Sequence, residues 1–246
     1  MRARASFDTF YARFRTRPVL RAILTAVSLV LALLALVHVV GPRPRAQSPP
    51  SDPCARRPLI LIHGHYYTNA SLTVLRDNFL RDGWPKDRVT MLDVRTSECT
   101  RAWSLALARK VEALTRTTGC PKVDIVSHSR GGLAAREYIR FLGGASRVAH
   151  LVTLGTPHHG AWSSRGCPGC GCREMRPGSA YLRRLNAGEE TRGPTAYTSI
   201  YSLSDDVVRP RSAWLKGARN VEMRGVTHTG LLRDRTVYEE IRAGLL

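Results

Sequence analysis

The stretch VDIVSHSRGG, residues 123–132, is the most informative part of this 246-residue chain about its fold. An apolar run leads into Ser127, His128 and Ser129, and two glycines follow. A strand that passes through a Ser-x-Ser-x-Gly turn into a helix is typical of a nucleophile elbow, in which a sharp turn lifts one hydroxyl above the sheet. Small residues are needed two positions before and two positions after that hydroxyl. Ser127 and Gly131 meet this need, so the pattern predicts Ser129 as the nucleophile.

Hydrophobic periodicity around this turn predicts strands that alternate with helices. Strands are expected at residues 58–64, 88–94, 122–127, 147–155, 197–203 and 220–226. Helices are expected at residues 71–83, 102–119, 133–144 and 236–246, the last with the capping-box spacing of Thr236 and Glu239. An irregular stretch is expected from 156 to about 192. The alternation predicts an α/β fold with a mostly parallel sheet and helices on both faces.

Polar residues that follow the predicted strands supply candidates for the rest of a catalytic site. Functional groups of such sheets gather at the carboxyl ends of the strands. A nucleophilic serine needs a histidine base and a carboxylate that orients it, in the chain order Ser, Asp or Glu, His. Asp205 follows one late strand and His228 follows the next, so they are the predicted acid and base. Asp206 remains an alternative acid.

The site also needs two backbone N–H groups to hold the oxyanion that forms when the serine attacks. The amides of His65, after the first strand, and of Arg130, after the nucleophile, are the predicted donors. His63 is expected to brace the loop of His65. His128 is expected to point away from Ser129, because neighbours on so tight a turn cannot face each other.

Two further pairs of polar residues lie at or near the predicted strands. His158 and His159 either line the substrate pocket or are simply exposed. Asp93 and Asp124, which end or interrupt strands, are interpreted as structural.

The first fifty residues differ in composition from the rest. Residues 1–21 are rich in arginine and are predicted to be a basic cytoplasmic segment. Residues 22–40 carry no charge and are long enough, as a helix, to cross a bilayer. This helix is interpreted as a signal anchor, with a cleavable signal peptide as the alternative. Residues 41–57 form a Pro/Arg-rich linker, and residues 58–246 are the predicted catalytic domain. Either interpretation exports that domain.

The chain is strongly basic, with a formal net charge of +19. The arginines are scattered rather than clustered, and a nucleic-acid partner does not suit an exported domain. Most of the charge is interpreted as compositional bias, with attraction to a membrane surface as a secondary possibility.

All six cysteines follow the apolar helix: Cys54, Cys99, Cys120, Cys167, Cys170 and Cys172. An even number outside the cytoplasm favours disulfides, whose connectivity the spacing leaves open. The alternative is zinc at residues 167–172, with His158 and His159 as the further ligands. Disulfides are favoured, and no metal site is predicted.

Several stretches carry a family resemblance. They are LILIHGH (59–65), VDIVSHSRGGLAAREYI (123–139), VTLGTPHHGA (152–161), REMRPGSAYLRRLN (173–186), TSIYSLSDDVV (198–208) and GARNVEMRGVTHTGLL (217–232). Together they resemble the small bacterial secreted lipases and esterases of lipase class 2, from about Pro58 to the C-terminus. The resemblance implies a compact α/β-hydrolase fold, carboxylic ester substrates that include acylglycerols, and the roles proposed above for Ser129, Asp205, His228, His65 and Arg130.

This chain departs from that family at two places near the site. Ser127 stands where Gly or Ala is usual, and the loop after His65 lacks the usual extra glycines. Tyr66 and Tyr67 are therefore expected to narrow the acyl pocket.

The sequence thus predicts an exported, membrane-anchored or secreted serine ester hydrolase that acts through an acyl-enzyme. An acyltransferase, a phospholipase and a catalytically silent binding module are the alternatives. The expected partners are a lipid or other ester substrate and, through the apolar helix, a membrane. The protein is expected to be a monomer that needs no cofactor and binds no nucleic acid.

Overall fold

The computed structural model describes residue Asp52 and residues 54–246. The predicted cytoplasmic segment 1–21, the apolar helix 22–40 and most of the linker 41–57 lie outside the described residues. Within the described part, every helix is too short or too polar to span a bilayer.

A six-stranded parallel sheet forms the centre of the domain, in the order β2-β1-β3-β4-β5-β6. The strands are β1 Leu59–Ile62, β2 Val89–Met91, β3 Val123–His128, β4 Val148–Leu154, β5 Ala196–Ser202 and β6 Arg219–Met223. The α-helices are α3 Thr73–Arg81, α4 Thr100–Thr118, α5 Arg130–Phe141, α6 Cys170–Met175, α7 Ala180–Asn186, α8 Pro210–Ala213 and α9 Arg235–Ala243. Short 3₁₀ turns are η2 Asn69–Leu72, η3 Lys86–Arg88, η4 Gly144–Ser146, η5 Trp162–Arg165 and η6 Gly230–Leu232. The predicted α/β fold class is confirmed.

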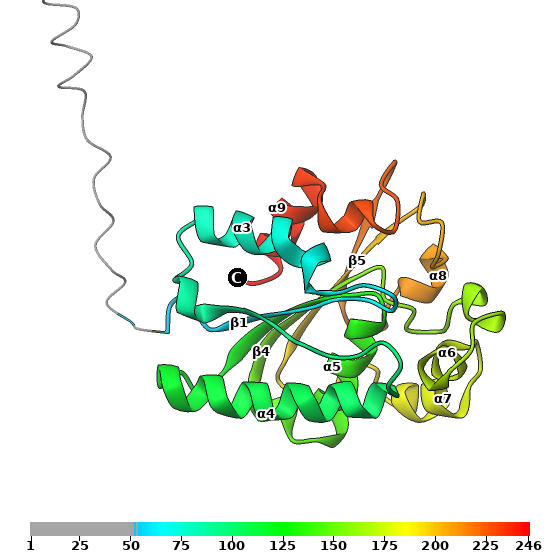
Figure 1. Ribbon diagram of the computed structural model, residues 1–246, viewed down its shortest axis with the longest axis horizontal. Coiled ribbons are helices and arrows are strands. Elements are labelled where there is room, and N and C mark those ends of the chain that lie inside the picture. Colours follow the sequence, from blue (N-terminus) through cyan, green and yellow to red (C-terminus); the bar gives the residue numbers. More distant parts are fainter. Residues whose placement is uncertain (1–51, 53) are drawn as a thin grey trace, which may run out of the picture. The chain divides into compact units, whose positions relative to one another are not determined.

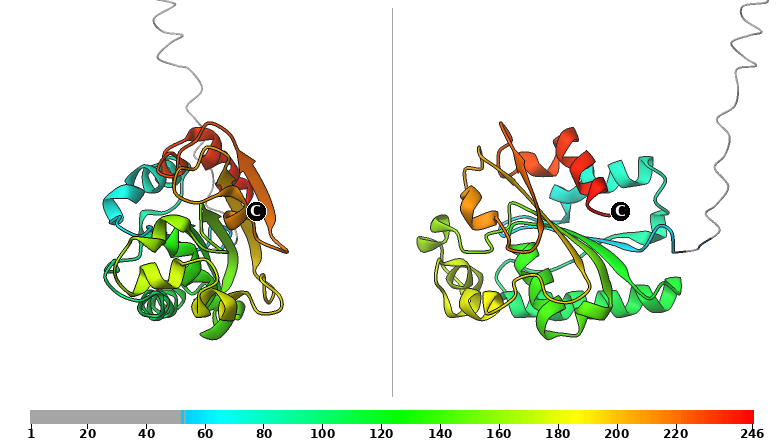
Figure 2. Two further views of the ribbon diagram at one scale, coloured as in Figure 1. Left: turned by 90° about the vertical axis from the view of Figure 1, so that its right-hand side faces the viewer. Right: turned by 180° about the vertical axis from the view of Figure 1, so that it is seen from behind.

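Helices cover both faces of the sheet because alternate side chains of each buried strand point to opposite faces. In β1, Leu59 and Leu61 pack in the core beneath α3 and α9, whereas Ile60 and Ile62 pack in the core beneath α4 and α5. Figure 1 shows these two helix pairs above and below the sheet, and Figure 2 shows the same layers from the side and from behind.

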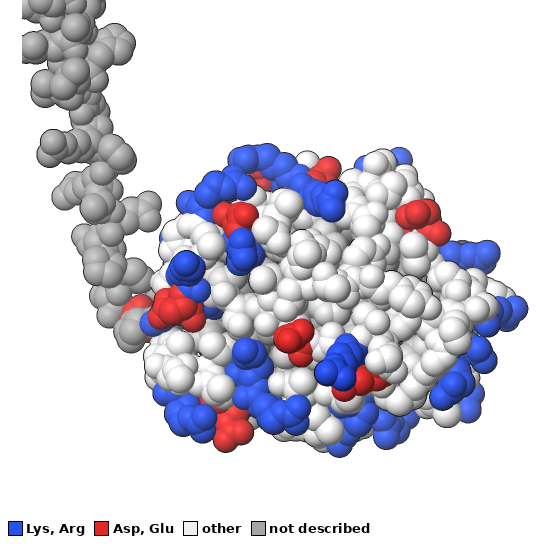
Figure 3. Space-filling model, in the orientation of Figure 1, with Lys and Arg blue, Asp and Glu red and all other residues white. Residues whose placement is uncertain are grey.

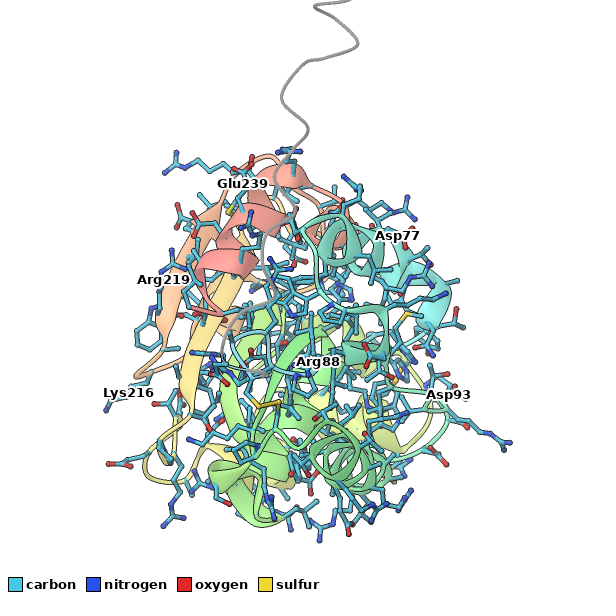
Figure 4. All side chains as sticks on the ribbon, turned by 90° about the vertical axis from the view of Figure 1, so that its left-hand side faces the viewer. Asp77, Arg88, Asp93, Lys216, Arg219 and Glu239 are labelled. Carbon is cyan, nitrogen blue, oxygen red and sulfur yellow. A yellow bond between two sulfur atoms is a disulfide. The ribbon has the colours of Figure 1, made fainter. Side chains whose placement is uncertain are left out.

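The edge strand β6 is more polar than the central strands, with Arg219 and Glu222 in its five residues. In Figure 4 the labelled side chains of Lys216 and Arg219 point outward along this edge. Charged side chains of this kind discourage the edge from pairing with another chain.

The stretch from 156 to 192, predicted to be irregular, contains two short helices. Helices α6 and α7 pack Met175, Leu182 and Leu185 against Leu133 of α5. The helices are too short for their periodicity to be recognised in the sequence, since six or seven residues make fewer than two full turns. This segment forms the end of the molecule at which the strands finish, together with α8 (Figure 1).

The final helix begins differently from the prediction. The side chain of Asp234, rather than that of Thr236, caps α9 by accepting a hydrogen bond from the amide of Val237 at 3.0 Å. Both residues are suitable caps, and the path of the chain into the helix decides which one is used.

Three disulfides pair all six cysteines: Cys54 with Cys120, Cys99 with Cys170, and Cys167 with Cys172. The preference for disulfides over zinc is confirmed, and the structure supplies the connectivity. The first bond lies near Arg88 in Figure 4 and attaches the residues before β1 to those before β3. The second attaches the start of α4 to α6.

Candidate active site

Ser129 occupies the turn between β3 and α5 in a strained backbone conformation. Its φ of +52° and ψ of −126° lie in a region that non-glycine residues rarely adopt, at a cost of about 1–3 kcal/mol. The Ser129 amide donates to the carbonyl of Leu154 at 2.8 Å, and its carbonyl accepts from the Thr156 hydroxyl at 2.9 Å. A Cβ at Gly131 would lie 2.7 Å from the carbonyl oxygen of His63, so only glycine allows this closeness of strand and helix. The predicted elbow is therefore present.

Asp205 and His228 are brought together from loops that follow β5 and β6. The Nδ1 atom of His228 lies 2.8 Å from Oδ2 of Asp205, and both side chains are almost fully buried. The other oxygen of Asp205 accepts from the amides of Val207 and Val208 at 2.9 and 2.7 Å. The carboxylate is thus held on both sides and can orient the imidazole.

Asp206, the alternative acid, occupies a different position. Its Oδ1 atom accepts a hydrogen bond from the backbone amide of His228 at 3.1 Å, and the residue is exposed. This bond lowers the pKa of the Asp206 carboxyl. The geometry favours Asp205 as the partner of the His228 ring.

His128 supports the loop of His228, which the sequence did not indicate. Its ring is fully buried 4.5 Å from the ring of His228, and its Nε2 atom lies 3.0 Å from the carbonyl oxygen of His228. Burial, and next the neighbouring His228, lowers the pKa of His128 to about 3. The ring is therefore neutral at ordinary pH and donates its Nε2 proton to that carbonyl.

The predicted oxyanion donors lie on either side of Ser129. His65 follows the end of β1, and Arg130 is the first residue of α5. Within the described part of the chain, neither backbone N–H donates to another residue. His63 braces the loop as expected, because its Nδ1 atom lies 2.8 Å from the carbonyl oxygen of Gly64 and its ring packs edge-on against Trp103.

The guanidinium of Arg130 joins several segments behind this loop. The side chain is completely buried and lies over the ring of Trp103, with Cζ 4.5 Å from the ring centroid. It donates to the carbonyls of Thr96 and Glu98 and to the hydroxyl of Thr100. Its Nη1 atom also lies 3.2 Å from Nδ1 of His65. One side chain thus connects the start of α4 with the loop that carries a predicted oxyanion donor.

A cleft of about 430 Å³ opens over the elbow. Ser129 and His228 both line it, so the structure brings the predicted nucleophile and base into one site. Its other walls are mostly apolar and include Tyr66, Tyr67, Pro157, Ala161, Met175 and Val208. Tyr66 and Tyr67, which are expected to narrow the acyl pocket, are among the residues that line this cleft.

His158 neither lines the cleft nor is exposed, so neither of the two roles expected for it from the sequence is correct. Its side chain is fully buried, with Nε2 3.2 Å from the hydroxyl of Thr153 and Nδ1 3.4 Å from Arg136. The turn after β4 directs this ring into the body of the domain. His159 is exposed and hydrogen-bonded through Nε2 to Glu190 at 2.8 Å.

The histidine beside the cysteine cluster is His65, and not His158 or His159. Its Nε2 atom lies 3.1 Å from Sγ of Cys172 and 3.6 Å from Sγ of Cys167. Arg130 can only donate, so Nδ1 of His65 must accept and the neutral ring carries its proton on Nε2. Burial, and next Arg130, lowers the pKa of His65 to about 4. A protonated Nε2 beside two disulfide sulfurs does not fit a metal-binding site.

Comparisons with known proteins agree with this fold. The family description of palmitoyl protein thioesterases matches residues 58–207. A triacylglycerol lipase from Burkholderia plantarii is 26% identical over 146 residues, which are 55% of this chain and 40% of the lipase. The chain therefore spans less than half the length of that relative.

Solved structures share the fold at low sequence identity. The mature lipase BlEst2 of Bacillus licheniformis has a TM-score of 0.66 at 17% identity, covering 80% of this chain and 95% of the lipase. Lipase B of Aspergillus fumigatus has a TM-score of 0.62 at 19% identity, covering 74% of this chain and 50% of the lipase. The expected relation to lipase- and esterase-type α/β-hydrolases is confirmed, and the chain belongs to the palmitoyl protein thioesterase family.

Proposed function

We propose that this protein hydrolyses carboxylic esters through an acyl-enzyme on Ser129. The observation that carries the proposal is the convergence at one cleft of a strained serine on an elbow and a histidine bonded to a buried carboxylate. Activation of a serine hydroxyl requires this combination. The relation to lipases and esterases supports the same class of reaction.

In the proposed reaction His228 accepts the proton of the Ser129 hydroxyl as its oxygen attacks the ester carbonyl. The amides of His65 and Arg130 hold the oxyanion, and the position of Arg130 at the start of α5 adds the positive end of a helix dipole. His228 then protonates the departing alcohol. A water molecule, deprotonated by His228, attacks the acyl-enzyme and releases the carboxylic acid and the free serine.

The cleft supports a substrate with an apolar acyl group. Met175, Val208 and Ala161 contribute apolar side chains to its lining, and Tyr66 and Tyr67 contribute aromatic rings. A cavity of this size suits a short or folded acyl chain better than a long extended one, since drug-sized pockets begin at about 300 Å³. We therefore infer a preference for short or medium acyl esters.

A thioester is a second candidate substrate, favoured by the match to palmitoyl protein thioesterases over residues 58–207. The same acyl-enzyme forms from either substrate, and only the leaving group differs. A thiolate leaves more readily than an alkoxide and depends less on protonation by His228. A comparison of kcat/KM for an ester and a thioester that carry the same acyl group would show which of the two substrates is preferred.

Export of the domain remains part of the proposal. Its support is the apolar segment 22–40 behind a basic flank, together with three disulfides, which persist in oxidising compartments. Fractionation of cells that make the full chain, followed by protease treatment of intact cells, would test this location.

Two serines of the elbow provide the test of the mechanism. Ser129→Ala is expected to lower kcat for a short p-nitrophenyl ester by at least about 10⁴-fold, because the nucleophile is removed. Ser127→Ala is the matched control, since its hydroxyl donates to the carbonyl of Val152 at 3.3 Å within the sheet. That variant is expected to keep kcat within about fivefold, because a single neutral hydrogen bond contributes only modestly.

Labelling with a fluorophosphonate distinguishes an enzyme from a silent binding module. The probe is expected to modify Ser129 in the wild-type chain and to leave Ser129→Ala unlabelled. Full activity in Ser129→Ala would overturn the proposed mechanism, and an unlabelled wild-type protein would favour the binding module.

A further inference from the structure

An exposed tryptophan next to residues that line the cleft lies close to two arginines. Trp162 is 47% exposed, although aromatic side chains of this size are usually buried. The guanidinium carbon of Arg165 lies 3.7 Å from its ring centroid, and that of Arg209 lies 5.7 Å away. Both distances are within the range of a cation–π interaction, so two positively charged guanidiniums lie close to one indole ring.

This cluster adjoins the walls of the cleft. Ser163 and Ser164, which follow Trp162, line the cleft, as do Val207 and Val208, which precede Arg209. The hydroxyl of Ser163 donates to the carbonyl of Val207 at 3.4 Å and joins the two segments. A group bound at Trp162 would therefore extend outward from a substrate whose carbonyl lies at Ser129.

Neither arginine of the cluster forms an ion pair with a carboxylate within the described part of the chain. Many other arginines of the domain do, from Arg57 to Arg242. Arg176 donates to the backbone carbonyl of Arg165 at 3.4 Å and likewise has no carboxylate partner there. In Figure 3 basic side chains lie along the edge of the molecule at which α6, α7 and α8 are found, and others lie at the upper left and along the lower side.

Two positive charges beside one aromatic ring repel each other, and an anion that binds next to both guanidiniums offsets this repulsion. A phosphate group suits this position because a guanidinium donates two parallel hydrogen bonds to two of its oxygens. A single carboxylate could satisfy one arginine, whereas a phosphate carries the charge and oxygens for both. The indole contributes apolar surface for the carbon atoms next to that phosphate.

We propose that Trp162, Arg165 and Arg209 bind a phosphate group on the substrate, so that the enzyme prefers acyl esters or thioesters with a phosphorylated alcohol or thiol. The inference rests on the proposed hydrolase activity and specifies its substrate class. Two sources supply this chemistry: a glycerophospholipid, or a soluble acyl thioester whose thiol component is phosphorylated.

The test compares substrates that differ only in the phosphate, with the full chain and below the micellar concentration of each lipid. One pair is 1,2-dihexanoyl-sn-glycero-3-phosphate and 1,2-dihexanoylglycerol. The other pair is hexanoyl 4′-phosphopantetheine and hexanoyl pantetheine. A higher kcat/KM for the phosphorylated member of the first pair indicates that the substrate is a phospholipid. A higher kcat/KM for the phosphorylated member of the second pair indicates that it is a soluble thioester.

Removal of both guanidiniums is expected to act on the phosphorylated substrate alone. The double variant Arg165→Met/Arg209→Met should raise KM for that substrate about 10- to 30-fold with kcat within about twofold, because two charge-assisted contacts are lost. The neutral substrate should keep its KM within about twofold. Arg165→Lys/Arg209→Lys should recover part of the loss. Arg116→Met/Arg235→Met, at exposed positions on α4 and α9, is the control for the loss of two positive charges.

Equal effects on the phosphorylated and neutral substrates, or no effect on either, would overturn the inference. Arginine-dependent binding to phosphatidylglycerol vesicles without any effect on the monomeric substrates would also overturn it, in favour of adsorption to a charged surface. If the wild-type chain hydrolyses none of the substrates, the proposed hydrolase activity fails. Calorimetric binding of dihexanoyl phosphatidic acid to Ser129→Ala, with and without the two arginines, then tests the phosphate site by itself.

Discussion

Adjacent aspartates after β5 differ in what they contact at His228. Asp205 binds the imidazole through Oδ2 at 2.8 Å, whereas Asp206 accepts from the backbone amide of the same histidine at 3.1 Å. Only the first contact orients the ring and stabilises its protonated form. The second contact fixes the loop, and a neutral amide oxygen can accept the same hydrogen bond.

Replacement of each aspartate by asparagine therefore separates the two roles. Asp205→Asn is expected to lower kcat for a p-nitrophenyl ester by about 10³- to 10⁴-fold, because the imidazolium that forms on His228 loses its counter-charge. Asp206→Asn is expected to change kcat by about threefold or less, since the surface charge is screened and the loop contact persists. Steady-state kinetics of both variants measures the difference. A large loss in Asp206→Asn alone would assign the acid role to Asp206.

Among the secondary-structure elements, Arg130 connects the starts of α4 and α5 with the loop of His65. Its buried guanidinium makes hydrogen bonds to Thr96, Glu98 and Thr100 and contacts Nδ1 of His65. Because His65 supplies one of the predicted oxyanion donors, the position of that donor depends on the packing of several elements. Arg136 is also buried, but its hydrogen bonds go to Asn186 and to the carbonyl of Glu190, which do not line the cleft.

The two buried arginines form a matched pair for mutation. Arg130→Met and Arg136→Met are both expected to lower the free energy of unfolding by about 2–4 kcal/mol, because each removes the hydrogen bonds of a buried guanidinium and leaves its mostly part-buried acceptors without a donor. Only Arg130→Met is expected to lower kcat, by about 10²-fold with a smaller change in KM, since a displaced oxyanion donor weakens binding of the transition state. Urea unfolding and steady-state kinetics provide the measurements. Equal changes in kcat for both variants would show that Arg130 acts through stability alone.

For the whole molecule, buried neutral histidines link folding to pH. The pKa of His128 is lowered to about 3 and that of His65 to about 4, and burial lowers the pKa of His158 well below its usual value. In the unfolded chain these rings titrate near pH 6.5. Between about pH 4 and 6.5 the unfolded state therefore binds more protons than the folded state, and the stability of the fold decreases as pH falls.

A variant of one buried histidine tests this linkage. His158→Gln is expected to reduce the slope of the unfolding free energy between about pH 4 and 6 by about one proton, or about 1.4 kcal/mol per pH unit. The wild-type chain, measured under the same conditions, gives the reference slope. Urea denaturation at pH 7.5, 6 and 5 measures the slopes. An unchanged slope in His158→Gln would contradict the assignment of a neutral buried ring.

Prediction from the sequence was most reliable where structure depends on neighbouring residues. Strand and helix periodicity, and the small residues of the elbow around Ser129, are local features of the chain. It was wrong for His158, and it missed the role of His128, because the surroundings of these rings come from segments far apart in the sequence. The helices α6 and α7 were missed because their short length leaves no recognisable period.

Patterns along the chain were enough to predict most of the strands and helices, the elbow, and the edge of the sheet at which Asp205 and His228 lie. These features follow from periodicity, from glycine's small size and from the parallel arrangement of the strands. The three-dimensional structure was needed to show which aspartate meets the His228 ring, how the six cysteines pair, and which histidine lies beside Cys167 and Cys172. These contacts depend on the paths of loops and on packing between distant segments, which a pattern along the chain does not contain.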